Sequence, residues 1–72
     1  MNKEDLEYDI SIALARWNEY SHFRLAGVEN LTRADIDTLL MCCDYYDQHG
    51  NLNGLRFFSP EVKAVLKNYG ML

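Results

Sequence analysis

Apolar side chains recur at steps of three and four residues in three separate stretches of this chain, and this spacing predicts three amphipathic helices. The first stripe comprises Leu6, Ile10, Ala13, Trp17 and Tyr20, the second Ile36, Leu39, Leu40, Cys43 and Tyr46, and the third Val62, Val65, Leu66 and Tyr69. A chain of 72 residues has room for one hydrophobic core. We therefore expect an all-α fold, a compact three-helix domain that occupies residues 1–72.

Start and stop signals bound the three predicted helices. The first is expected from about Lys3 to about His22, with an asparagine before it as N-cap. The second follows a capping box at Thr32–Asp35 and runs to about Gln48, where a glycine follows. The third begins at Ser59-Pro60, because serine caps a helix well and proline suits its first turn.

The two connections between these helices carry different signals. Residues 23–31 are predicted to form a loop from which Phe23, Leu25 and Val28 reach the core. In the second connection, Asn53-Gly54 is a strong two-residue hairpin signal. Its flanking runs are too short for a stable sheet, so residues 51–58 are expected to form a tight turn or a very short β-hairpin between helices 2 and 3.

Charge is unevenly distributed along the chain. The formal net charge is -4, from 11 acidic and 7 basic side chains. Ten of the acids lie in residues 1–48, whereas residues 49–72 carry a net charge of +2. An acidic chain is poorly suited to neutralise phosphates, which argues against nucleic acid as a partner. It favours a partner with a basic surface.

The two cysteines, Cys42 and Cys43, are adjacent and cannot join distant segments of the chain. Small secreted domains usually depend on disulfides, so this pattern indicates a reducing compartment. The N-terminal residues lack the basic start and apolar run of a signal peptide. No stretch reaches the length of a membrane span. We expect a cytoplasmic protein that does not bind membranes.

Candidate catalytic and metal motifs fail on spacing. A calcium loop starting at Asp47 would place Leu52 where glycine is required and Phe58 where the bidentate acid is required. Adjacent cysteines do not match the spacing of zinc ligands. A nucleophilic cysteine would need an oriented base, which nothing in the sequence supplies. We therefore expect no enzyme activity, no metal and no cofactor.

Each of the first two helices carries a second apolar stripe opposite the first. Because one core buries one stripe per helix, this surplus is typical of an interface. The acids of the first helical turn would lie at its rim. The sequence predicts a small acidic protein-binding module, a regulator, inhibitor or adaptor of the kind that bacteria and phages encode, which occludes a partner's surface. Its predicted partner-binding residues are Tyr8, Ile12, Met41, Tyr45, Glu4 and Asp5.

Four alternatives compete with this interpretation, and the first is that the tyrosines of the second stripes simply lie flat on the surface. Apolar residues of the two connections would cover the second stripes; they are Phe23, Leu25, Leu55, Phe57 and Phe58. The stripes would otherwise join two copies of the chain in a homodimeric structural module. A helix-turn-helix nucleic-acid binder is the weakest alternative, because roughly ten residues separate helices 2 and 3, where such motifs use three or four. Lys63 and Lys67 are also few cations for a recognition helix.

Overall fold

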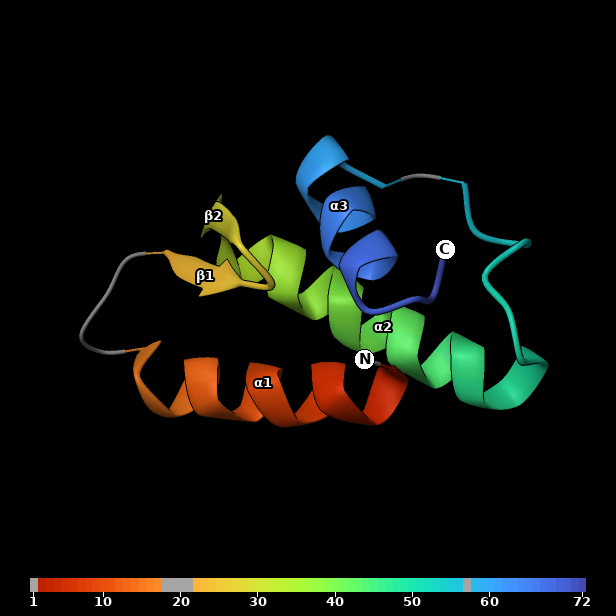
Figure 1. The fold of residues 1–72 in the computed structure, drawn as a ribbon, viewed down its shortest axis with the longest axis horizontal. Helices are drawn as coiled ribbons and strands as arrows, with labels where there is room; N and C mark the ends of the chain where they lie inside the picture. Colours follow the sequence, from red (N-terminus) through yellow and green to blue (C-terminus); the bar gives the residue numbers. More distant parts are fainter. Residues whose placement is uncertain (1, 18–21, 57) are drawn as a thin grey trace.

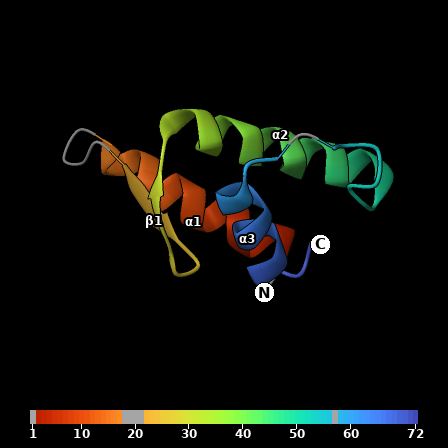
Figure 2. The same cartoon turned by 90° about the horizontal axis from the view of Figure 1, so that it is seen from above.

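In the residues that it describes, the computed structural model has three helices and one two-stranded antiparallel sheet (Figure 1). It describes residues 2–17, 22–56 and 58–72. In chain order the elements are α1 (Lys3–Ala15), β1 (Phe23–Leu25), β2 (Val28–Leu31), α2 (Arg33–His49) and α3 (Pro60–Asn68). The helices α1 and α2 run in opposite directions along the long axis of the molecule, and the hairpin joins them at one end (Figure 2).

The prediction of an all-α fold is wrong, because the chain between α1 and α2 forms a β-hairpin. Its two-residue turn consists of Ala26 (φ 51°) and Gly27 (φ 82°). Positive φ at both central residues suits the right-handed twist of a hairpin. Of the two expectations for residues 51–58, a tight turn or a very short β-hairpin, the turn is confirmed and the hairpin is wrong: the described residues form a turn at Asn53-Gly54 without strands, and Gly54 does not have a positive φ.

A β-bulge aligns the apolar side chains of the hairpin. Phe23 pairs with Leu31 and Leu25 with Val28, so β2 carries one more residue than β1 between the two pairs. Asn30 absorbs the irregularity in the left-handed region (φ 63°), which asparagine tolerates better than most residues. As a result Phe23, Leu25 and Leu31 are all buried. The expectation that Phe23, Leu25 and Val28 reach the core is confirmed.

The helix starts lie where the sequence predicts them. The side chains of Asn2, Thr32 and Ser59 accept hydrogen bonds from the backbone N–H three residues later, at 3.1, 3.2 and 3.2 Å. The end of α1 differs, because the helix stops at Ala15 and β1 begins at Phe23. Residues 18–21, which the prediction assigned to the first helix, lie outside the described residues.

One cluster of buried side chains forms the core, and every helix and both strands contribute to it. The third stripe is buried completely, whereas Ala13, Trp17, Leu40 and Tyr46 of the first two stripes pack at the border of the core. The buried residues of α1 and α2 are Leu6, Ile10, Ile36, Leu39, Cys42 and Cys43. This core leaves one side of α1 uncovered.

Candidate functional site

Three of the four predicted apolar anchors are exposed. The exposed fraction is 67% for Tyr8, 51% for Met41 and 39% for Ile12. Tyr45 differs, because it is half-buried and packs against the core. Its ring packs against His49 in a tilted arrangement with 4.2 Å between centroids, and its hydroxyl lies against Gly54. The segment after α2 therefore covers part of Tyr45 through Gly54, a residue that the alternative of covering connections did not name.

The exposed side of α1 carries four of the predicted partner-binding residues. We call it the outer face of α1; it consists of Glu4, Asp5, Tyr8, Ile12 and Ala15, all of them exposed. It lies opposite the buried Leu6 and Ile10 because helical periodicity separates the two sets. Asp5 also stabilises the start of the helix, since its carboxylate accepts a hydrogen bond from the backbone N–H of Asn2 at 3.3 Å.

Met41 belongs to a different part of the surface. It is exposed on α2, on the side opposite the buried Leu39 and Cys43. The six predicted residues therefore divide into the outer face of α1, an exposed methionine on α2 and a tyrosine covered by the connection to α3. Only the first group combines apolar side chains with acids on a single element.

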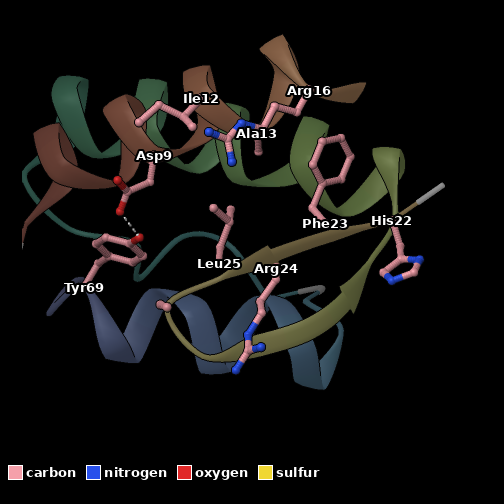
Figure 3. A pocket seen from close by; sticks show the side chains of 10 residues that line it. Asp9, Ile12, Ala13, Arg16, His22, Phe23, Arg24, Leu25 and Tyr69 are labelled. Carbon is pink, nitrogen blue, oxygen red and sulfur yellow. Dashed lines mark hydrogen bonds between the residues drawn. The ribbon is translucent and has the colours of Figure 1, made fainter. Parts of the chain in front are cut away.

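A second feature was not predicted from the sequence: a cleft of about 480 Å³ lies between α1, the hairpin and the end of α3 (Figure 3). Helix α1 supplies one wall and β1 the other, and Tyr69 closes one end. Its described lining residues are Asp9, Ile12, Ala13, Arg16, His22, Phe23, Arg24, Leu25, Ala26 and Tyr69.

A hydrogen bond closes the end of the cleft at α3. The hydroxyl of the buried Tyr69 donates to Oδ2 of Asp9. Burial raises the pKa of Tyr69 well above its ordinary value, and the bond to Asp9 raises it further. The phenol therefore stays protonated at neutral pH and keeps its role as donor. This contact fixes the Asp9 carboxylate at that end of the cleft.

The two arginines of the cleft are placed differently. Arg24 lies on β1, and its guanidinium points away from α1 and forms a 3.3 Å ion pair with Glu29 (Figure 3). Arg16 is the C-cap residue of α1, and its guanidinium turns back along the helix over the cleft, towards Asp9 and Leu25 (Figure 3). Within residues 2–17, 22–56 and 58–72 no carboxylate forms an ion pair with Arg16.

A smaller hollow of about 280 Å³ lies between the start of α1 and the end of α3. Its cation is Lys3, whose Nζ lies 2.6 Å from Oε1 of Glu7 and 2.5 Å from Oδ1 of Asp47. The contact with Asp47, followed by that with Glu7, raises the pKa of Lys3. The ion pair between Lys3 and Asp47 joins the start of α1 to the end of α2, so the charge of this lysine stabilises the fold.

The two cysteines are free and buried in α2. Burial raises the pKa of Cys42 to about 11 and that of Cys43 to about 12. Because the thiolate is the nucleophile and the metal ligand, these thiols are poorly suited to either role at neutral pH. In the described part of the chain, no three His, Cys, Asp or Glu side chains are grouped so that they could hold a metal ion.

No protein-family model matches the chain, and neither a curated protein nor a solved structure is significantly similar to it. Among the described residues, none of the helices has the length and apolar character needed to cross a membrane.

Proposed function

We propose that this protein is a binding module for another protein and that the outer face of α1 is its contact surface. The supporting observation is the exposure of Tyr8, 67% of which is open to solvent beside the exposed Ile12 on the same helix. Large apolar side chains gathered on one exposed face are typical of interfaces, and tyrosine is enriched among the residues that dominate binding energy.

The mode of binding follows from the shape and charge of this face. A helix held at its start by a capping box is a rigid element that fits an apolar groove on a partner. Glu4 and Asp5 lie at one end of the face, so the matching groove carries basic side chains at that end. Occupying such a groove would block other ligands of the partner, as a regulator or inhibitor does.

Two further parts of the proposal concern Met41 and the cell compartment. Met41 on α2 is a secondary contact for a partner large enough to reach both helices, whereas Tyr45 is excluded because the segment around Gly54 covers it. We place the protein in the cytoplasm, because both cysteines are free and buried. Binding, and not catalysis, is the activity that we propose.

Photo-crosslinking tests this proposal. A photoreactive phenylalanine analogue in place of Tyr8 should form a covalent adduct with one partner in cells, and mass spectrometry then identifies it. With the purified partner, Tyr8→Glu should weaken binding at least about tenfold, because it places a charge in an apolar contact. Lys67→Gln on the exposed side of α3 is the matched control and should bind as the original chain does.

Two results would overturn the proposal. In the first, Tyr8→Glu folds normally by circular dichroism and binds the identified partner with unchanged affinity. In the second, light scattering shows a stable dimer that Tyr8→Glu dissociates, which would assign this face to self-association.

A further inference from the structure

We propose that the cleft between α1 and β1 binds an organic monocarboxylate with an apolar body, either a free acid or the carboxylate end of an apolar peptide. This site lies beside the outer face of α1 and has a different chemistry. Three features of the cleft support this ligand: its apolar walls, the cation above it and the carboxylate at its end.

The walls of the cleft are apolar and come from elements that the core holds in place. Ile12 and Ala13 line the helical side, and Phe23 and Leu25 line the strand side. Phe23 and Leu25 are buried in the core below the opening of the cleft. The ring of Phe23 stacks on that of Trp17, with 4.9 Å between the ring centroids. A volume of about 480 Å³ is within the range of small-molecule sites. These walls suit an aromatic or branched aliphatic body.

The cation above the cleft is Arg16. Its guanidinium turns over the apolar walls, and in the described part of the chain it has no ion pair (Figure 3). Guanidinium presents paired N–H groups that match the two oxygens of a carboxylate. A cation at the end of a helix also favours the helix dipole, but that role would be satisfied with the side chain in solvent. Its position over the cleft points to an anionic ligand.

Asp9 limits which anions fit. Its carboxylate is fixed at the α3 end of the cleft by the hydroxyl of Tyr69. A ligand with a second negative group there would meet Asp9 at short range, and like charges in a partly desolvated site repel strongly. We therefore expect one carboxylate, placed at Arg16, with the apolar body lying over Leu25.

NMR titration of the full chain tests this inference. Adding 4-phenylbutyrate should shift the amide signals of Ala13, Leu25 and Ala26 in a saturable way, with a dissociation constant in the millimolar range or below, typical of a ligand of this size. The neutral 4-phenylbutyramide should bind about tenfold more weakly, because it lacks the charge that Arg16 pairs with. Phenylsuccinate, with a second carboxylate, should bind more weakly than phenylbutyrate.

Three variants test whether phenylbutyrate binds in the cleft. Arg16→Gln should lose about tenfold in affinity for phenylbutyrate and leave the amide analogue unchanged. Lys63→Gln, a cation of α3 that does not line the cleft, is the matched control and should bind normally. Tyr8→Glu should also bind normally, so failure at this site is distinguishable from failure of the proposed partner surface.

A second titration distinguishes a free acid from the C-terminal end of a peptide. It uses N-acetyl-leucyl-phenylalanine as the free acid and as the C-terminal amide. Tighter binding of the peptide acid than of phenylbutyrate indicates a chain terminus, and the reverse indicates a free acid; both support the site. Equal affinity for acids and amides, shifts confined to other residues, or no shift up to about 10 mM ligand would overturn it.

Discussion

The connection between α1 and α2 and the connection between α2 and α3 are held in place by different interactions. Between α1 and α2 the chain turns at Ala26-Gly27 and pairs two strands, whereas between α2 and α3 it turns near Asn53-Gly54 and pairs none in the described residues. The first connection forms its own hydrogen-bonded ladder and offers apolar side chains to the core. The second lies along α2 and depends on side-chain contacts with that helix.

Each connection contains a glycine at its turn, and the two glycines have different structural roles. Gly27 adopts a positive φ of 82° and has no other atoms near the position of a Cβ, so the backbone conformation, and not a lack of space, favours glycine there. A Cβ on Gly54 would overlap the hydroxyl of Tyr45, so a larger residue there would have to displace the tyrosine side chain. The same residue type thus serves a strand-pairing turn in one place and a close approach to a helix in the other.

Each connection is also tied to the rest of the fold differently. Nδ2 of Asn68 donates to the carbonyl of Ala26 at 2.8 Å, which fixes the turn of the hairpin to the end of α3. In the second connection, Oδ1 of Asn51 accepts from the backbone N–H of Asn53 at 3.0 Å, a purely local bond. The buried Leu52 is its main anchor in the core. We therefore expect the hairpin to be the more stable of the two.

The largest expected effect on stability comes from replacing the buried leucine that holds each connection in the core. Leu31 of β2 is 0% exposed and Leu52 is 2% exposed. Leu31→Ala should lower the free energy of unfolding by about 2–5 kcal/mol, and Leu52→Ala by an amount nearer the lower end, because its surroundings can collapse more easily. Urea unfolding followed by circular dichroism measures both, with the exposed Met41→Ala as control within about 0.5 kcal/mol.

A larger loss for Leu52→Ala than for Leu31→Ala would reverse the expected order. It would mean that the irregular segment, and not the hairpin, contributes more to the stability of the domain.

The second test distinguishes the two glycines. Gly54→Asn should destabilise the protein by about 1–3 kcal/mol because its side chain collides with Tyr45. Gly27→Asn should cost less than about 1 kcal/mol, because asparagine tolerates a positive φ and the site is open. Thermal unfolding measures both variants. Combining Gly54→Asn with Tyr45→Ala should produce a coupling in the double-mutant cycle, and strict additivity would contradict a collision with Tyr45.

The smallest expected effect concerns Asp35, which contacts the ends of both connections. Its Oδ2 accepts from the backbone N–H of Thr32 at 2.9 Å, and its Oδ1 accepts from Oγ of Ser59 at 3.4 Å. Asp35→Ala should cost about 1 kcal/mol through the lost capping box. Asp5→Ala removes the same kind of box at α1 without a link to another helix, and is the matched control.

We expect Asp35→Ala to cost a few tenths of a kcal/mol more than Asp5→Ala, because the bond to Ser59 is long and weak. Equal losses in chemical unfolding would show that Ser59 and Asp35 do not couple the two helix starts.

Features that depend on residues close together in the sequence were predictable, whereas features that depend on distant residues were not. The caps at Asn2, Thr32 and Ser59 were predictable because each depends on a side chain and a backbone N–H three residues away. The hairpin was missed because Ala26-Gly27 is a weaker turn signal than Asn53-Gly54, although among the described residues the strands form at the former and not at the latter. The cleft was missed because its end joins Asp9 to Tyr69, 60 residues later.

The amino-acid sequence by itself determined where the three helices begin, which face of each is buried, and the excess of acids over bases, because these follow from local hydrogen bonding, helical periodicity and composition. Only the tertiary structure decided which turn pairs strands, that Gly54 covers Tyr45 while Tyr8 stays open, and that Arg16 lies over an apolar cleft. The physical reason is steric: these outcomes depend on which distant side chains pack together, and packing selects among local conformations that short stretches of sequence allow equally.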